Sequence, residues 1–205
     1  MIYILTGGPA TGKGTRSDIL ANALNIPHIS TGDMLREESR KNEEMANALS
    51  KGILVSDETI TRLLDERISN DDCKDGFILD GYPRTLKQVE LLNNLLNEKN
   101  RKITKVIELT VPDELAFRRI LERKQCEKCG KMYGIDFPPK IEDVCDVCGG
   151  KLVIRTDDTK ETLKRRIDTY KANSKDILEY YKNTGLLITV DASAHPENIV
   201  KEATE

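Results

Sequence analysis

A glycine-rich loop near the start of the chain has the residue types of a phosphate-binding site. The segment from Gly7 to Thr15 reads GGPATGKGT, so Lys13 directly follows Gly12. This spacing matches the P-loop, with one extra glycine before the hydroxyl residue. Glycines let backbone N–H groups surround phosphate oxygens, the helix N-terminus attracts anions, and the lysine reaches the β- and γ-phosphates. A plain glycine-rich turn is the alternative, but a strand before the loop and a helix after it favour ATP or GTP binding. The expected ATP contacts in this loop are Gly8, Pro9, Ala10, Thr11, Gly12, Lys13, Gly14 and Thr15.

Four of the five cysteines form two Cys-x-x-Cys pairs. Cys126 and Cys129 make the first pair, and Cys145 and Cys148 make the second. Each pair supplies two thiolates, and two pairs complete a tetrahedron around Zn²⁺, with iron as the less favoured metal. Four protein ligands leave no position for water or substrate, so we expect a structural zinc rather than a catalytic one. The fifth cysteine, Cys73, lies in a polar turn and is assigned no role.

The elements that must position these residues alternate between strands and helices. A helix with apolar residues on one face follows most of the strands. Alternation of this kind predicts a parallel five-stranded sheet with helices on both faces, which is an α/β fold. The expected strands cover residues 2–6, 26–29, 77–80, 106–111 and 186–190.

Two segments interrupt this alternation. Residues 30–59 are polar and helical in pattern, and residues 124–158 are rich in cysteine, glycine and proline. We interpret both as inserts on a core made of residues 1–29, 60–123 and 159–205.

Composition limits the possible partners. The 205 residues include 32 Lys and Arg against 35 Asp and Glu, a net charge of −3, and this balance argues against a general nucleic-acid binder. The lysines around the cysteine pairs are outnumbered by nearby carboxylates, so a nucleic-acid-binding zinc ribbon is not expected. No apolar run approaches the roughly 18 residues that span a bilayer. The chain starts on an apolar strand without a basic leader, and we expect a cytoplasmic protein with no membrane partner.

Two further motifs carry a family resemblance. Thr31 to Arg36 reads TGDMLR, and Asp80 to Thr85 reads DGYPRT. Together with the P-loop, Asp158 and a later arginine, they resemble the adenylate kinase family in order and spacing over nearly the whole chain. The segment around the cysteines resembles the long, zinc-binding lid of the bacterial-type enzymes. The resemblance implies a P-loop nucleoside-monophosphate kinase fold, with a helical NMP-binding insert at 30–59 and a zinc-ribbon lid at 124–158.

The resemblance also implies an activity and its site residues. The activity is Mg²⁺-dependent, reversible transfer of the terminal phosphoryl group from ATP to AMP, giving two ADP in a protein that is usually a monomer. Arg119 is expected near the adenine of ATP, and Asp80 is expected to orient Mg²⁺ through its water shell. The residues expected to act on the transferring phosphoryl group are Lys13, Asp80, Arg84, Arg123, Arg155 and Arg166. The residues expected around AMP are Thr31, Arg36, Ile53, Leu54, Val55, Gly81, Tyr82, Pro83, Arg84, Gln88, Arg155 and Arg166.

Other functions remain open at this point. A UMP or CMP kinase of the same fold is the nearest one, although Thr31 and the zinc lid favour AMP. A P-loop hydrolase or switch protein would leave Arg36 and Arg84 without a purpose. The sequence also departs from the family pattern at residues 191–196, which read DASAHP, so no late backbone contact to adenine is assigned there.

Overall fold

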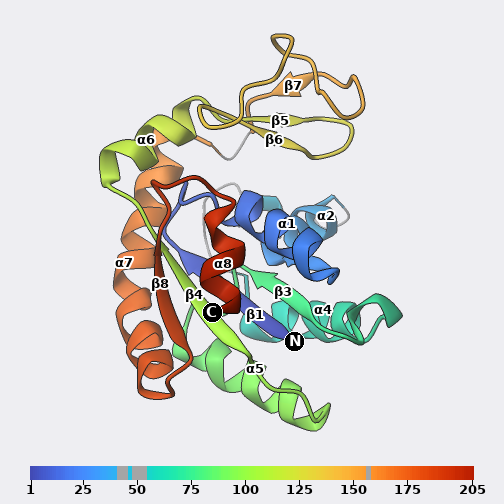
Figure 1. Cartoon of the computed structure of the whole chain (residues 1–205), viewed down its shortest axis with the longest axis vertical. Helices are drawn as coiled ribbons and strands as arrows, with labels where there is room; N and C mark the ends of the chain where they lie inside the picture. The colour runs from blue at the N-terminus through green and yellow to red at the C-terminus, as the bar shows by residue number, and fades with distance from the viewer. Residues whose placement is uncertain (41–45, 48–54, 156–157) are drawn as a thin grey trace.

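A parallel five-stranded sheet forms the centre of the molecule (Figure 1). The computed structural model describes residues 1–40, 46–47, 55–155 and 158–205. The strands lie in the order β2-β3-β1-β4-β8, and each neighbouring pair is parallel, which confirms the predicted α/β fold. Their bounds are β1 Ile2–Gly7, β2 His28–Ser30, β3 Phe77–Asp80, β4 Lys105–Thr110 and β8 Leu187–Asp191.

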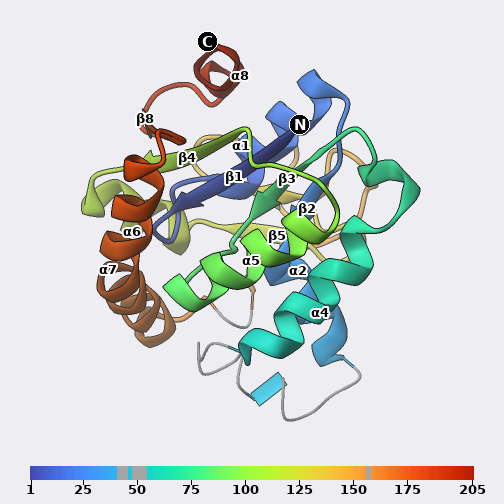
Figure 2. The ribbon, with the colours of Figure 1, turned by 90° about the horizontal axis from the view of Figure 1, so that it is seen from below.

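Alternating side chains of the strands build a core on each face of the sheet. In β1, Ile2 and Ile4 join one buried cluster, whereas Tyr3 and Leu5 join the other. The first cluster includes apolar residues of α4, α5 and α7, and the second includes those of α1 and α8. Figure 2 shows the sheet between these two groups of helices. The helices are α1 Lys13–Leu24, α2 Thr31–Ser39, α4 Asp57–Ile68, α5 Leu86–Glu98, α6 Asp113–Leu121, α7 Lys160–Asn183 and α8 Asn198–Thr204, with a short 3₁₀ helix at Asp71–Cys73.

Hydroxyl side chains fix where several of these helices begin. Ser30, Ser56, Thr85 and Thr159 each accept a hydrogen bond from a backbone N–H in the first turn of the helix that follows. Such N-caps satisfy donors that a helix leaves unpaired. The caps before α2 and α5 therefore help to fix the two motif segments that begin at Thr31 and end at Thr85.

The strand bounds differ from the sequence prediction by one or two residues. The second strand begins at His28 rather than at Ile26, because Pro27 has no N–H to donate to a neighbouring strand. Pro27 still accepts a hydrogen bond from Ile78 N through its carbonyl. The last two strands run over 105–110 and 187–191 instead of 106–111 and 186–190.

The cysteine-rich segment forms a separate small sheet above the carboxyl ends of the main strands (Figure 1). Its strands β5 Lys124–Cys126, β6 Met132–Tyr133 and β7 Leu152–Val153 are antiparallel, in the order β6-β5-β7. The buried residues here are only Cys126, Tyr133, Cys145 and Leu152 among those described. A core this small needs another source of stability, such as a bound metal.

Candidate active site and metal centre

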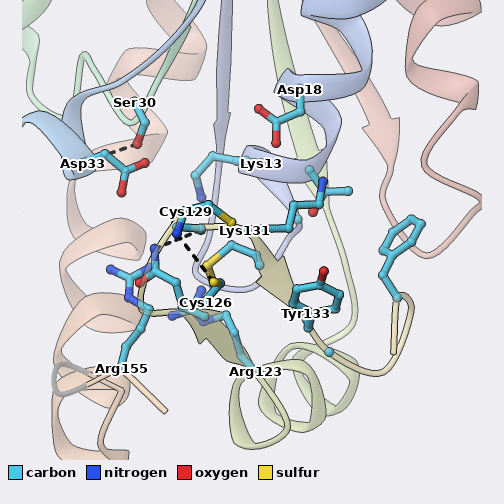
Figure 3. Close-up of a pocket in the computed structure, with 18 of the residues that line it drawn as sticks. Lys13, Asp18, Ser30, Asp33, Arg123, Cys126, Cys129, Lys131, Tyr133 and Arg155 are labelled. Atoms are coloured by element: carbon cyan, nitrogen blue, oxygen red, sulfur yellow. Dashed lines mark hydrogen bonds between the residues drawn. The ribbon is translucent and has the colours of Figure 1, made fainter. Parts of the chain in front are cut away.

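A cavity of about 1000 Å³ lies between the P-loop, α2 and the small sheet. Lys13, Arg36 and Asp80 line it from the core side, and Arg123 and Arg155 line it near the small sheet. Figure 3 shows Lys13 extending into this space from one side and Arg123 and Arg155 from the other. The cavity thus brings together cations from segments that are far apart in the chain.

The P-loop begins with a backbone conformation that requires glycine at Gly7. Gly7 has φ +148°, and a Cβ there would lie 2.6 Å from the carbonyl oxygen of Leu109. Lys13 curls back over the loop, and its Nζ donates to the carbonyls of Gly7 and Gly8 at 2.9 Å each. Burial lowers the pKa of Lys13 to about 8, while the nearby carboxylate of Asp80 opposes this shift. Phosphate oxygens would suit this cation better than two neutral carbonyls.

Arg84 and its surroundings form a second group of cations. The Arg84 Nε donates to the carbonyl of Gly81 at 2.6 Å. Burial lowers the pKa of Arg84, and Arg166 and Arg36 act in the same direction while Asp80 opposes them. Arg36 forms an ion pair with Asp33, and both residues line the cavity. Several like charges therefore lie close together, an arrangement that favours a highly anionic ligand.

Two of the residues predicted around AMP form hydrogen bonds with other protein groups in this structure. Thr31 is fully buried, and its hydroxyl donates to the carbonyl of Asp80 at 3.1 Å. The Gln88 carbonyl oxygen accepts from the backbone N–H of Arg84 at 2.6 Å, and its amide donates to Asp57 at 2.8 Å. Both side chains fix the DGYPRT motif, and their contact with AMP stays a prediction.

Of the other residues predicted around AMP, some pack within the core and two lie outside the part of the chain that the structure describes. Gly81 has φ +84°, and a Cβ there would lie 2.9 Å from the hydroxyl of Thr31. Tyr82 is buried and its hydroxyl is 3.0 Å from that of Thr61, while Val55 packs against the core cluster of the same face. Pro83 is buried next to Tyr82. Ile53 and Leu54 lie outside the described residues.

The four paired cysteines come together in the small sheet. Their sulfur atoms all lie within 4.8 Å of one another, with Cys126 Sγ 3.5 Å from Cys148 Sγ and Cys129 Sγ 3.6 Å from Cys145 Sγ. A sulfur tetrahedron around zinc at about 2.3 Å has edges of roughly 3.8 Å, so the four thiolates fit this metal. The Tyr133 hydroxyl lies 3.4 Å from Cys145 Sγ and supports this ligand from outside the tetrahedron.

Comparisons with known proteins agree with this geometry. A family model described as adenylate kinase matches residues 5–186. The adenylate kinase of Caldicellulosiruptor saccharolyticus is 42% identical over 98% of this chain and 96% of its own length. The adenylate kinase of Archaeoglobus fulgidus is 42% identical over 98% of this chain and 95% of its own length. That of Staphylococcus aureus strain Mu50 is 42% identical over all of this chain and 98% of its own.

The chain belongs to the adenylate kinase family. The enzyme transfers a phosphoryl group between ATP and AMP, and the comparisons do not favour the alternative of a UMP or CMP kinase. Among the described residues, no helix is both long and apolar enough to cross a membrane.

Two residues of this adenylate kinase make contacts near the site that the sequence does not predict. Asp158 is almost fully buried and pairs with two predicted arginines at once. Its carboxylate accepts from Arg123 Nε at 2.8 Å and lies 3.6 Å from Arg166 Nη1. The sequence motif places Asp158 in the site but does not predict these partners, because Arg123 lies between α6 and β5 and Arg166 lies on α7. It keeps the two guanidinium groups side by side despite their like charge.

His28 is the second unexpected residue near the cavity. Its Nδ1 lies 2.8 Å from Asp18 Oδ1, and its Nε2 lies 3.6 Å from Asp80 Oδ2. Burial opposes a charge on this ring, but the two carboxylates raise the pKa of His28 to about 9. A lone histidine on a short strand carries no sequence signal of these partners, because they come from α1 and β3.

Proposed function

We propose that the cation-rich cavity is where this adenylate kinase performs the reaction ATP + AMP ⇌ 2 ADP. The observation that carries this assignment is that Lys13 and Arg123 line the cavity, and that Arg84, Arg123 and Arg166 all lie close enough to Lys13 to lower its pKa. Transfer between two nucleotides brings many negative oxygens together, and a cluster of fixed cations offsets that charge.

In the proposed reaction, an oxygen of the AMP phosphate attacks the γ-phosphorus of ATP. The new P–O bond forms as the bond to the β–γ bridging oxygen breaks, and the electron pair of that bond leaves with ADP. The enzyme supplies no nucleophile of its own, so catalysis comes from alignment and from cations matched to the transition state. Lys13 would hold the β- and γ-phosphates, Arg36 and Arg84 the AMP phosphate, and Arg123, Arg155 and Arg166 the transferring group.

Asp80 is the residue that would orient Mg²⁺ through its water shell. It is 8% exposed, borders the cavity beside Lys13, and its Oδ2 would lie 3.9 Å from a Cβ built on Gly14 of the P-loop. A buried carboxylate next to the phosphate loop suits a hard cation that keeps several waters. When bound, Mg²⁺ neutralises charge on the phosphate oxygens of ATP.

A smaller cavity of about 260 Å³ is the proposed place for the adenine of ATP. It borders the P-loop at Gly12 and Thr15, and Arg119 and Phe137 line it from two other segments. A guanidinium and an aromatic ring can both stack on a flat base. This supports the expected position of Arg119 near the adenine.

The two inserts are proposed to exclude water while the phosphoryl group moves. The insert at 30–59 would close over AMP, and the zinc-ribbon lid at 124–158 would close over ATP. Without such closure, ATP would transfer its phosphoryl group to water. The zinc would act on the lid structure alone, since its four cysteine ligands leave no free position.

A coupled assay for ADP formation tests the proposal with ATP and each nucleoside monophosphate in turn. We expect the highest kcat/KM with AMP. Faster turnover of CMP or UMP would overturn the adenine assignment, and phosphate release without any monophosphate would indicate a hydrolase. We further propose a cytoplasmic monomer, which light scattering and cell fractionation would test.

A further inference from the structure

The side chain of Arg16 joins two loops that are far apart in the sequence. It projects from the first turn of α1 and is only 3% exposed. Its Nη1 donates to the carbonyl of Thr11 at 3.2 Å, and its Nη2 donates to the carbonyls of Ala192 and Ala194 at 2.8 and 2.9 Å. One buried cation thus holds the P-loop against the segment 192–196, which connects β8 to α8 beside the start of α1 (Figure 1).

A second arginine reaches the same segment. Arg119 Nη2 donates to the carbonyl of Ala192 at 3.0 Å, and its Nε lies 2.7 Å from Asp136 Oδ2 of the lid. Burial and the neighbouring Arg119 lower the pKa of Arg16. Two guanidinium groups this close repel each other, and the Ala192 carbonyl that accepts from both of them offsets part of the repulsion. The positions of Arg16, Arg119 and the Ala192 carbonyl therefore depend closely on one another.

The P-loop leaves room for this arrangement. A Cβ on Gly12 would lie 2.6 Å from Arg16 Nη1, and the φ of Gly12 is +77°. Glycine at this position therefore leaves space for the Arg16 guanidinium and also allows the positive φ of the phosphate loop.

The segment held by Arg16 forms one wall of the smaller cavity. The guanidinium of Arg16 donates to the carbonyls of Ala192 and Ala194, and the consecutive residues Ser193, Ala194, His195 and Pro196 border the cavity. The conformation of this wall decides which polar groups face a bound base. Adenine and guanine differ in the donors and acceptors at the ring edge, so a rigid polar wall can distinguish them.

We propose that Arg16 is a positioning residue that sets the preference of the smaller cavity for ATP over GTP. The inference rests on the proposed function, in which the base of the donor nucleotide binds in this cavity. Arg16 acts through the segment 192–196. When its planar guanidinium is lost, this segment becomes less rigid and the cavity discriminates less between adenine and guanine. Lysine cannot replace it, because one ammonium group does not reproduce the fork that joins three carbonyls.

The test compares Arg16→Lys and Arg16→Met with the wild-type enzyme, below the melting temperature of each protein. Steady-state rates give KM and kcat for ATP, GTP and AMP. We expect the KM for ATP to rise roughly tenfold, since buried hydrogen bonds are lost, and the ATP/GTP ratio of kcat/KM to fall by a similar factor. The KM for AMP and the kcat at saturating ATP are expected to stay within about twofold, as for a loss of uniform ATP binding.

Arg62→Gln is the matched control, because Arg62 is exposed on α4 and pairs only with Glu66 among the described contacts that involve it. Unchanged ATP KM and an unchanged ATP/GTP ratio in folded Arg16→Lys would overturn the inference, as would equal rises in KM for ATP and AMP. If Arg16→Met does not fold, the lysine variant still gives the answer. Calorimetric titration with ATP and GTP tests the same preference without catalysis, so failure of the proposed function would be seen separately.

Discussion

The charge of Lys13 is expected to make ATP turnover depend on pH. Its ammonium group donates to two P-loop carbonyls, and burial lowers its pKa to about 8. Phosphate binding requires the protonated form. We therefore expect kcat/KM for ATP, which reports on the free enzyme, to fall as the pH rises through about 8. Lys13→Arg stays charged over this range, so its profile is expected to be flat there, at a lower rate.

Removal of the Lys13 charge is a separate test. We expect Lys13→Met to lower kcat by roughly 10²–10³-fold, the usual cost of losing one group that stabilises the transition state. Circular dichroism should show an intact fold. Lys87→Met is the control, since Lys87 is largely exposed and pairs with Glu90 on α5. Near-normal turnover of folded Lys13→Met would contradict its placement at the phosphates.

The cysteine cluster depends on the absence of a side chain at Gly150. A Cβ at this position would lie 2.8 Å from Cys126 Sγ, 2.9 Å from Lys128 Cβ and 3.3 Å from Cys148 Sγ. We expect Gly150→Ala to crowd the metal ligands and to cost about 1–3 kcal/mol, as overpacking does elsewhere. Zinc release to a chelator should be faster than in wild type. Lys151→Ala, which changes an exposed neighbour, should leave the release rate unaltered.

At the scale of elements, the lid is the part that depends most on its metal. Its small sheet buries few residues, so zinc binding contributes directly to its folding. We expect metal removal to lower the melting temperature while leaving the rate nearly unchanged at a temperature where the stripped lid still folds. Arg36, Arg84 and Arg166 support this expectation, because they lie outside the small sheet.

The zinc experiment uses a chelator with a thiol-reactive mercurial, followed by reduction and a comparison of melting curves with low-temperature rates. Readdition of Zn²⁺ is the control for damage to the thiols. Complete loss of rate in a folded, cold apoprotein would indicate a catalytic metal. An unchanged melting curve would mean that the cysteines bind none.

Elements were predictable from sequence where their signal is local. The P-loop and the cysteine pairs are short motifs, and the apolar strands are predicted to within one or two residues of their bounds, with Pro27 causing the largest shift. The pairing of Arg123 with Asp158 spans 35 residues, and that of Arg16 with Ala192 spans 176. Such contacts depend on which strands become neighbours, and a residue type alone does not determine them. For this reason, the sequence does not predict the contacts of Arg16 and His28, and it places Asp158 in a motif without predicting its arginine partners.

At the scale of the whole molecule, His28 connects α1, β2 and β3 through Asp18 and Asp80. The pKa of His28 is raised to about 9 in the folded state, from 6.5. The stabilisation of the fold by protonated His28 is therefore fully present below about pH 6.5 and is lost as the pH rises through 9. We expect the free energy of unfolding to fall by roughly 1–2 kcal/mol between pH 6.5 and 8.

Between pH 6.5 and 8, the effect of His28 on stability can be measured separately from that of Lys13. The pKa of Lys13 is lowered in the folded state, so its effect on stability has the opposite sign and begins only above pH 8. Denaturant unfolding at constant zinc concentration provides the measurement, with His28→Gln as the variant that cannot titrate. A wild-type stability that rises from pH 6.5 to 8, or an equal slope in the variant, would contradict the assignment.

The buried carboxylate of Asp158 has a consequence for how binding responds to ionic strength. Arg123 and Arg166 already have a built-in counter-ion, and their charge is partly neutralised before any nucleotide arrives. An incoming phosphate therefore displaces fewer mobile salt ions than the number of arginines implies. We expect the affinity for ATP to decline with added salt less steeply than a count of site cations suggests, and Asp158→Asn to steepen that decline. The enzyme would then lose less of its nucleotide affinity as the salt concentration around it rises.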